Sequence, residues 1–561
     1  MSASCDDKLK IASRLSAFGT DFIEAGWPGS NPKDAEFFRR AQTELDEGTR
    51  TKLVAFGSTR RKGVRVEDDP QIKALVDSGA PTVCIVAKGH LWQVTDILRA
   101  TPEENIDMIR ESVSYLVGRG LRVMIDLEHF FDGHKYDSCY ALKCCHAAAN
   151  AGARCLVLCD TNGASMPWQV DEATRAVINA YPTVTVGMHA HNDCGMAVAN
   201  SVSAARAGAG LIQGTINGIG ERTGNADLCS IIPSLALHVG SKVACLDNLP
   251  DLTSVSRFVD ETFNRAHVSS APFVGTSAFA HKGGLHVAAM ERSPMSYQHV
   301  DPAAVGNEKR ILISELSGRQ NILGKIHEVG DIRNDTAEDA ARASERATAI
   351  LNRVKQLESY GYTFEGAEAS VDLMILHGNE HYCPPFCVLD YSTMVSDSNL
   401  DSASRVVLDA HSDVGPEHSA ATARATIKVR TIDLDYDPNS DAESAKPYVD
   451  RLEVSDGNGP VDALASALKR ALIPNHPHVE KIELVDYKVR ILDPEQATGA
   501  ATRVMIEFRD PEGDISWTTV SVDRNVISAS LNALVDGFEY ALIDCGCLLQ
   551  ESDFLSNSLT S

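Results

Sequence analysis

The sequence has few aromatic residues and little positive charge for its length. Only 6% of its 561 residues are Phe, Trp or Tyr, and 52 Lys and Arg stand against 77 Asp and Glu, a formal charge of −25 at pH 7. This balance disfavours nucleic acid and anionic membranes as partners, because both reward clustered Lys and Arg. No uninterrupted apolar run is long enough to span a bilayer, so we expect a soluble protein.

A secretory signal is also missing, although the sequence contains 14 scattered cysteines. We therefore expect reduced thiols in a cytoplasmic protein, or in an organelle-matrix protein if a transit peptide has been lost with a missing amino terminus. Cys383 and Cys387 lie near His377 and His381 in the sequence, and four such residues can form a metal site. Their spacing fits no standard zinc pattern, and buried cysteines that bind no metal are commoner.

Helical and strand patterns alternate from residue 7 to about 240, which predicts parallel α/β structure. The strands are apolar throughout, as expected when both faces of a sheet are covered. Seven such strands can be counted, among them Asp21–Ala25, Lys52–Phe56, Thr82–Val86, Arg122–Ile125, Cys155–Leu158 and Thr183–Val186. An eight-stranded barrel begins with a strand, whereas this chain enters a helix at Asp7. We predict a TIM (β/α)8-type barrel over residues 1–240 that lacks its first strand.

The rest of the chain predicts a connector and a second folded module. Residues 241–420 read as helical connector subdomains, with a helix at Ala337–Ser359 and a Ser/Asp-rich linker near 395–420. Residues 421–550 predict an α+β domain, and 551–561 a frayed tail. Its expected strands and helices are Thr422–Ile432, Val479–Leu492, Thr502–Phe508, Pro460–Leu472 and Val526–Leu542.

His189 and His191 follow the apolar run Thr183–Val186. Residues two apart in a strand point the same way, so both imidazoles face one side at the strand's carboxyl end. Two convergent imidazoles suit a divalent metal, and we favour this over two polar strand residues that bond only to neighbours.

A glycine-rich segment follows at Gln213–Asp227. Its four glycines let backbone approach a ligand closely, and Asn225 precedes a helix. An Asn before a helix is by default an N-cap, and Gly-rich turns mostly make turns, so only the neighbouring His pair favours a functional reading.

Two further strand ends carry acidic and polar side chains. Asp126 and Glu128 point to one face, and the Phe-Phe pair that follows implies a partly closed environment that raises a carboxyl pKa and disfavours solvated loop charges. Such a pair can bind a metal or move protons. The segment Cys159–Gly163 suits a small carboxylate substrate, although an Asp/Asn turn is the ordinary explanation.

These strand ends resemble those of the citramalate and isopropylmalate synthases, and the resemblance covers nearly the whole chain. The HxH and GNAD motifs are shared with homocitrate synthases and hydroxymethylglutaryl-CoA lyases, whereas GWPGSNPKD and EHFFDG look specific to the citramalate branch. The lyases lack a carboxy-terminal sensing module, which favours a synthase. Further matching segments are Gly26–Asp34, Val54–Arg61, Ser314–Arg319 and Leu484–Ile491.

The resemblance implies condensation of acetyl-CoA with pyruvate, in isoleucine biosynthesis, by a homodimer with a divalent metal (Mg, Mn or Zn). It implies His189 and His191 as metal ligands, with Asn225 a third ligand or close neighbour. Glu128 corresponds to a pocket carboxylate and Thr161 to a contact of the oxo acid carboxylate, and we add Asp126 as substrate-binding.

Two features outside the barrel gain meaning from the same resemblance. His286 resembles the histidine that the connector of a second subunit delivers to the catalytic centre; without the motif it reads as a loop histidine in water. Gly457, Asn458 and Gly459 put backbone N–H groups at a helix start, a natural carboxylate site, and imply isoleucine or leucine as effector. A capped helix packing in a dimer fits these residues equally well.

The family's first strand ends in a DTTLRDGEQ-like sequence, whose Arg polarises the substrate and whose Asp binds the metal. No residue here matches it, and matching restarts at Asp7. A barrel without one strand has two unpaired edges, so we expect an in-frame segment of this type upstream of Met1. Two alternatives stay open: a 2-isopropylmalate synthase acting on 2-oxoisovalerate, and a catalytically inactive truncated paralogue with an effector-binding role.

Overall fold

The structure is a computed structural model that falls into two compact units. Unit 1 comprises Met1–Ala280 and Gln298–Arg310, and unit 2 comprises His281–Tyr297 and Ile311–Ser561. The boundaries expected at 240 and 420 stay predictions, and the linker from 397 and the tail 551–561 lie outside the described residues. Described are residues 3–281, 283, 286, 289–290, 292–314, 317–328, 337–379, 382–396, 422–432, 448–512 and 515–544.

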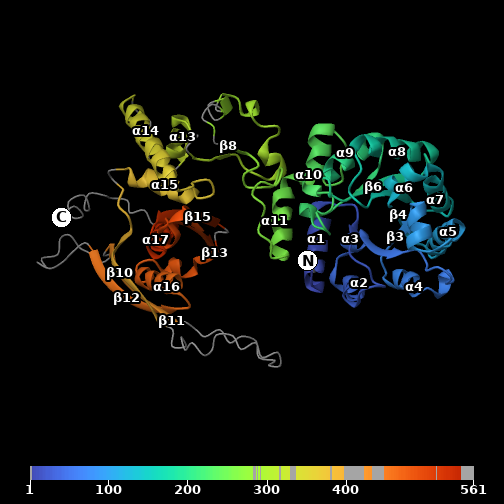
Figure 1. Ribbon diagram of the computed structural model, residues 1–561, viewed down its shortest axis with the longest axis horizontal. Coiled ribbons are helices and arrows are strands. Elements are labelled where there is room, and N and C mark those ends of the chain that lie inside the picture. The colour runs from blue at the N-terminus through green and yellow to red at the C-terminus, as the bar shows by residue number, and fades with distance from the viewer. Residues whose placement is uncertain are drawn as a thin grey trace, which may run out of the picture. The chain divides into compact units, whose positions relative to one another are not determined.

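A curled sheet of seven parallel strands forms the centre of unit 1 (Figure 1). The strands follow one another in chain order without a crossover, as in a TIM-type barrel, which confirms the predicted fold class. β1 and β7 are its edges, and no other strand of the described residues pairs with them. The strands are β1 (Ile23–Glu24), β2 (Leu53–Ser58), β3 (Thr82–Lys88), β4 (Arg122–Glu128), β5 (Cys155–Asp160), β6 (Thr185–Ala190) and β7 (Leu211–Gln213).

Helices cover the outer face of this sheet, and their starts are readable in the sequence. Asn31 and Thr101 cap α2 and α5 through their side chains, each directly before a proline that is preorganised for the first helical position. The helices of unit 1 are α1 (Cys5–Phe18), α2 (Pro32–Glu44), α3 (Glu47–Arg50), α4 (Pro70–Asp77), α5 (Pro102–Gly118), α6 (Phe130–Tyr136), α7 (Ser138–Asn150), α8 (Pro167–Ala180), α9 (Ala197–Ala207), α10 (Leu228–Pro233) and α11 (Leu252–Thr262).

The sheet is apolar on both faces because each face packs. Its outer face joins the helices in the largest hydrophobic core, with Leu53, Val83, Ile125 and Leu156 fully buried. Its inner face carries a smaller cluster of buried residues: Val54, Cys84, Met124, Cys155, Val157 and Cys159. Since parallel strands end at one edge, the polar residues that follow these apolar stretches meet at the carboxyl mouth of the sheet.

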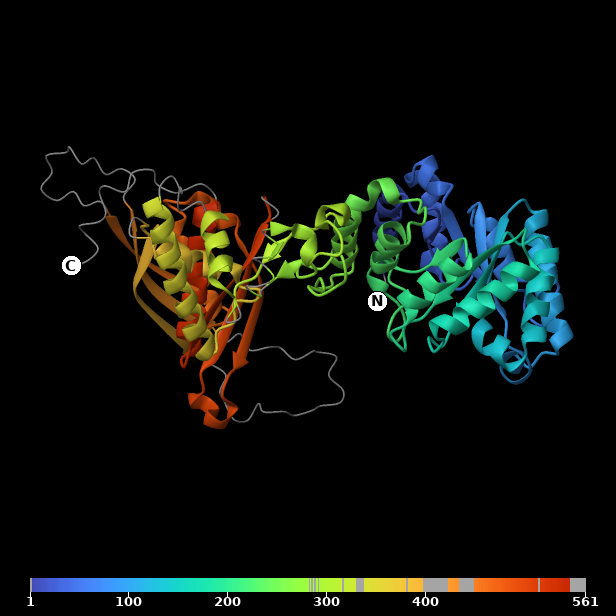
Figure 2. The same ribbon diagram turned by 90° about the horizontal axis from the view of Figure 1, so that it is seen from above.

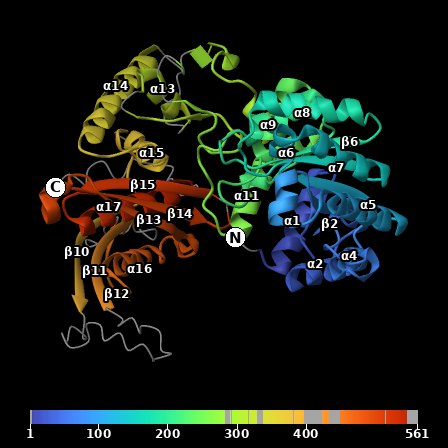
Figure 3. The same cartoon turned by 45° about the vertical axis from the view of Figure 1, so that its right-hand side comes forward.

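Unit 2 contains a helical part and a pair of three-stranded antiparallel sheets (Figures 2 and 3). α14 (Ala337–Ser359) matches the predicted helix. Each sheet is followed by one helix, which packs on it: α16 (Pro460–Leu472) and α17 (Val526–Asp544). The remaining elements are α13 (Arg319–Glu328), α15 (Glu368–His377), β10 (Phe386–Ser396), β11 (Thr422–Ile432), β12 (Tyr448–Gly457), β13 (Glu483–Ile491), β14 (Thr502–Asp510) and β15 (Ile515–Asp523). The short strands β8 (Ala280–His281) and β9 (Arg310–Ile311) pair with each other, and each has one residue in unit 1 and one in unit 2.

α17 is long and apolar enough to cross a membrane by length and composition alone. In the structure its apolar side chains lie in the core of unit 2, where Leu534 and Phe538 are fully buried and Phe538 packs against Phe508. These contacts are those of a core helix in a globular module.

Candidate active site at the mouth of the sheet

β6 positions the histidine pair. His189 is the penultimate residue of β6 and is in register with Cys159 on β5 and Gln213 on β7. His191 follows the strand end, where its backbone pairs with that of Asn225. The centres of the two imidazole rings lie 5.2 Å apart. The structure therefore brings together the three residues expected to bind the metal.

His191 offers an unused ring nitrogen. Its Nδ1 is buried and has no hydrogen-bond partner. Partial burial, followed by the nearby His189 and Arg222, lowers the pKa of His191 to about 4. The imidazole is therefore neutral at pH 7, which is the form that binds a metal ion.

Asn225 offers an unused oxygen on the same side of the loop. Its Nδ2 donates to the carbonyl of Ile219 at 3.2 Å, while its buried Oδ1 has no partner. A Cβ on Gly220 would lie 2.4 Å from Nδ2 of Asn225, so glycine there permits this close packing. The N-cap of α10 is Asp227, whose side chain accepts from the N–H of Cys229, so the N-cap explanation for Asn225 is wrong.

Two imidazoles and an amide oxygen fit a divalent cation with nitrogen and oxygen ligands. Buried acceptors without donors are costly, and a cation would satisfy both His191 Nδ1 and Asn225 Oδ1. In the part of the chain that the structure describes, no group of three His, Cys, Asp or Glu side chains is placed to hold a metal. The candidate set therefore consists of His189, His191 and the amide oxygen of Asn225.

Asp126 lies on the inner face beneath the histidines. Only 5% of the residue is exposed, and its Oδ1 accepts from the Cys84 thiol at 3.0 Å and from Gln213 Nε2 at 3.1 Å. Burial raises the pKa of Asp126, against the opposing effect of His189. Its role in binding substrate stays a prediction, because its hydrogen bonds are made within the sheet.

A further carboxyl group, Glu24 on β1, faces the same interior. The residue is accessible at the open edge of the sheet, but surrounding protein atoms and the Asp126 carboxylate raise its pKa to about 8. The predicted strand Asp21–Ala25 contains Glu24, but sequence reasoning did not single out this carboxyl group as a site residue. Two neighbouring acidic groups with raised pKa values are typical of functional sites.

Glu128 ends β4 at the mouth and forms an ion pair with Lys88, the last residue of β3. The two residues are register partners, and each side chain is about one quarter exposed, at 26% and 27%. Sequence reasoning missed Lys88, although a lysine directly after an apolar strand was a usable signal. The ammonium group fixes the position of the Glu128 carboxylate.

Thr161 follows β5 and keeps its hydroxyl proton available. Its Oγ1 accepts from the N–H of His129 at 2.8 Å. Its carbonyl accepts from Arg222, which also pairs with both oxygens of Asp193 at 2.8 Å. The hydroxyl can thus donate to an anionic ligand, and Arg222, also missed from the sequence, fixes the Gly-rich loop beside it.

A groove of about 460 Å³ opens beside these strand ends. Two aromatic side chains on its wall, Trp92 and Tyr136, are 45% and 65% exposed. Its lining is His90, Trp92, Gln93, His129, Asp132, Lys135, Tyr136 and Asn162. The groove offers both aromatic surface and hydrogen-bonding groups to a ligand.

The other predicted site residues belong to unit 2. His286 is exposed and its ring stacks on Tyr297 with the ring centres 4.1 Å apart. Gly457 ends β12 and Gly459 is the N-cap residue of α16, while the N–H of Asn458 donates to Asp462 at 2.8 Å. Both assignments stay predictions.

The cysteine and histidine group near residue 380 has no metal-site geometry among its described members. His377 bonds to Glu539 at 2.6 Å, and Cys383 and Cys387 are unpaired thiols. His381 lies outside the described residues. All twelve cysteines in the described ranges are free, in line with the expected reduced state.

Comparison with known proteins places this site in a family. The (R)-citramalate synthase of Aquifex aeolicus (strain VF5) is 41% identical over 543 residues, which are 97% of this chain and 95% of the relative. That of Synechocystis sp. (strain ATCC 27184 / PCC 6803 / Kazusa) is 41% identical over 561 residues, 98% and 95% of the two chains. The chain belongs to the (R)-citramalate synthase family.

Family models match three stretches of the chain. Residues 1–259 match the HMGL-like model, 273–358 the homocitrate synthase post-HMGL domain-like model, and 396–542 the LeuA allosteric (dimerisation) domain. The 2-isopropylmalate synthase of Sulfolobus acidocaldarius is more distant, at 31% identity over 364 residues, 65% of this chain and 88% of the relative. The (R)-citramalate synthase family is one of acyltransferase-type enzymes, and its carboxy-terminal domain is of a dimerising type.

Proposed function

We propose that this chain forms (R)-citramalate from acetyl-CoA and pyruvate by condensation and thioester hydrolysis. Membership of the family supports the reaction. The observation that carries it at the site is the pair of unpartnered acceptors, His191 Nδ1 and Asn225 Oδ1, beside His189. Mg²⁺, Mn²⁺ and Zn²⁺ each accept such ligands.

His189, His191 and Asn225 would hold the cation, which supplies Lewis-acid polarisation of the 2-oxo acid carbonyl. Glu128, fixed by Lys88, takes a proton from the methyl group of acetyl-CoA. The resulting carbon nucleophile forms the new bond to the carbonyl carbon of pyruvate, while the C=O π electrons move to the oxygen, which takes up a proton and becomes the hydroxyl of the product. Water then cleaves the thioester and releases CoA.

Binding of the substrates is assigned to groups around this centre. The Thr161 hydroxyl, oriented by the His129 N–H, donates to the pyruvate carboxylate. The groove with Trp92 and Tyr136 takes part of acetyl-CoA. His286 of a second subunit acts in proton transfer, and isoleucine or leucine binds near Gly457, Asn458 and Gly459.

Steady-state turnover with pyruvate and with 2-oxoisovalerate tests the substrate assignment. Preference for pyruvate is expected, and preference for 2-oxoisovalerate would make the chain an isopropylmalate synthase. None of its 561 residues matches the DTTLRDGEQ-like strand, which carries a substrate-polarising Arg and a metal-binding Asp in the family. We therefore assay two chains: the 561 residues alone, and an extended chain in which such a strand precedes them.

The extended chain is expected to carry the full activity, because the strand pairs with the free edges of β1 and β7 and adds a carboxylate ligand. An extended chain that folds and binds the cation but forms no product would favour the inactive paralogue. Equal activity of both chains would show that the strand is dispensable.

A further inference from the structure

A chain of hydrogen bonds joins Asp126, Gln213 and His189 across three strands of the sheet. Gln213 Oε1 lies 2.7 Å from Nδ1 of His189, and Gln213 Nε2 lies 3.1 Å from Oδ1 of Asp126. Gln213 is the last residue of β7 and the register partner of His189 on β6. Its amide therefore bridges the expected metal ligand and a buried carboxyl group.

Asp126 decides which way the Gln213 amide points. Oδ1 of Asp126 also accepts from the Cys84 thiol at 3.0 Å, so both donors meet the same oxygen. Because this oxygen acts as an acceptor, the NH₂ group of Gln213 must face it. This holds whether or not the other oxygen of Asp126 carries a proton.

The amide orientation then decides the tautomer of His189. With its NH₂ group on Asp126, Gln213 presents its carbonyl oxygen to Nδ1 of His189. A carbonyl oxygen can only accept, so Nδ1 must carry the hydrogen. In a neutral imidazole this leaves the lone pair on Nε2, which is the nitrogen free to bind a cation.

We propose that Gln213 is a positioning residue which, oriented by Asp126, holds His189 in the Nδ1–H tautomer that presents Nε2 to the metal. The proposal rests on the proposed function for the identity of the metal site. It gives Asp126 a role as an acceptor in the Asp126–Gln213–His189 relay, distinct from contact with substrate.

Two nearly isosteric substitutions test the relay through cation affinity of the 561-residue chain, measured by calorimetric titration with Mn²⁺. Gln213→Leu removes the acceptor for His189 and is expected to lower affinity 10- to 100-fold, as second-shell losses do. Asp126→Leu leaves the Gln213 amide free to rotate and is expected to lower Mn²⁺ affinity by no more than Gln213→Leu does. Gln213→Leu with Asp126→Leu should equal Gln213→Leu alone, because Asp126 acts only through Gln213.

Asp126→Asn separates positioning from charge. The Asn oxygen can still accept from Gln213, so affinity within about threefold of the parent is expected. If the carboxylate instead attracted the cation by its charge, Asp126→Asn would lose as much affinity as Asp126→Leu. Cys84→Ala tests the other neighbour of the amide, because the Cys84 thiol donates to Oδ1 of Asp126 at 3.0 Å and its sulfur accepts from Gln213 Nε2 at 3.7 Å. Affinity within about threefold of the parent is expected, since Asp126 still accepts from Gln213. A loss as large as that of Asp126→Leu would assign the amide orientation to Cys84 instead.

The tautomer itself is read without metal by ¹⁵N–¹H correlation of the histidine side chains, with His189 assigned by His189→Asn. The parent and Asp126→Asn should show Nδ1–H, and Gln213→Leu should lose this preference. An Nε2–H tautomer in the parent, or unchanged tautomer and affinity in Gln213→Leu, would overturn the relay. If the parent showed the Nδ1–H tautomer but bound no Mn²⁺ in either the 561-residue chain or the extended chain, the result would instead contradict the metal site of the proposed function.

Discussion

Lys88 and Glu128 are register partners at the carboxyl ends of β3 and β4, and their side chains form an ion pair at the mouth of the sheet. Both strands pack into the core on their outer face, where Ile85 and Ile125 are fully buried. The backbone of both residues is therefore fixed by packing of the strands into the core. A base such as Glu128 at the end of a packed strand keeps its position relative to neighbouring strand ends.

Glu128→Gln should abolish most of the activity. The amide has the same shape but cannot take the methyl proton, so kcat should fall about 10²- to 10⁴-fold. The measurement is CoA release with pyruvate and acetyl-CoA, with Glu36→Gln on the exposed face of α2 as control. A kcat within threefold of the parent would remove Glu128 from its role as base.

Lys88→Met should lower kcat by roughly tenfold, because the Glu128 carboxylate loses the group that fixes its position. Lys88→Arg keeps the positive charge and should recover part of the loss. Steady-state kinetics distinguishes this from a binding effect, since KM should change less than kcat. Equal rates for Lys88→Met and the parent would contradict the positioning role.

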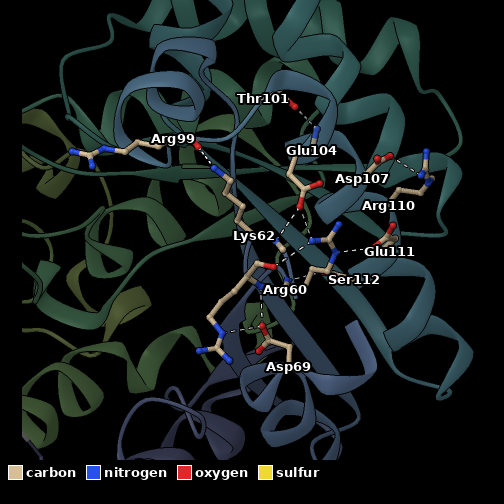
Figure 4. A network of polar contacts seen from close by, with 12 residues as sticks. Arg60, Lys62, Asp69, Arg99, Thr101, Glu104, Asp107, Arg110, Glu111 and Ser112 are labelled. Atoms are coloured by element: carbon tan, nitrogen blue, oxygen red, sulfur yellow. Dashed lines mark hydrogen bonds and ion pairs between the residues drawn. The ribbon is translucent and has the colours of Figure 1, made fainter. Parts of the chain in front are cut away.

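Arg60 ties the segment after β2 to α5 (Figure 4). Its side chain is 6% exposed, donates to Glu111 at 2.6 Å and pairs with Glu104 at 2.9 Å. Arg60→Met should cost about 2–3 kcal/mol of unfolding free energy, because charged hydrogen bonds are lost in a largely buried place. Equilibrium unfolding in urea measures the difference in unfolding free energy between Arg60→Met and the parent.

The control for this prediction is Arg39→Met. Arg39 pairs with Glu36 on the surface, and its side chain is 70% exposed. Such pairs contribute about 0–1 kcal/mol, so little change is expected. A loss for Arg60→Met no larger than that for Arg39→Met would show that the network in Figure 4 adds little stability.

Asp536 on α17 should make the stability of unit 2 depend on pH. Burial, followed by the neighbouring Glu539, raises the pKa of Asp536 to about 7, whereas the unfolded chain releases this proton near pH 3.8. Between these values the folded state binds one proton more, so stability is lost as pH rises through about 7. The side chain of Asp536→Asn does not titrate, so this contribution to the pH dependence of stability is absent from the variant.

Asp536→Asn should therefore be more stable than the parent at pH 8 by at least about 1 kcal/mol, with a shallower decline from pH 5 to 8. Scanning calorimetry at several pH values checks this. Asp493→Asn, whose carboxylate bonds to Gln496 on the surface, is the control and should keep the slope of the parent. Identical slopes in all three chains would refute the prediction.

Strand and helix periodicity predicted much of the fold because the barrel strands are continuous apolar runs. Leu53–Ser58 and Cys155–Asp160 extend the predicted strands by a few polar residues, which apolar patterning does not include. β13 lies within the predicted strand Val479–Leu492, whose first residues instead belong to the 3₁₀ helix Pro477–Lys481. β12 was not predicted, since Leu452 and Val454 are exposed and their apolar pattern marks no buried face.

The candidate site was readable from the sequence only in part. Strand periodicity explains why His189 and His191 face one side, but the partner of His189 is Gln213, and a glutamine at a strand end carries no special pattern. The orphaned oxygen of Asn225 depends on Gly220 and Ile219, a loop geometry that spacing alone does not specify. The ion pair of Lys88 with Glu128 could be recognised only from the register of β3 with β4, which the sequence does not give.

The most direct test is product analysis with both 2-oxo acids in one reaction, using acetyl-CoA, Mn²⁺ and the extended chain. Chiral chromatography should show (R)-citramalate, with kcat/KM for pyruvate at least about 10-fold above that for 2-oxoisovalerate, because the pocket must reject a larger side chain. Predominant 2-isopropylmalate, or no product from a folded chain that binds the cation, would contradict the account.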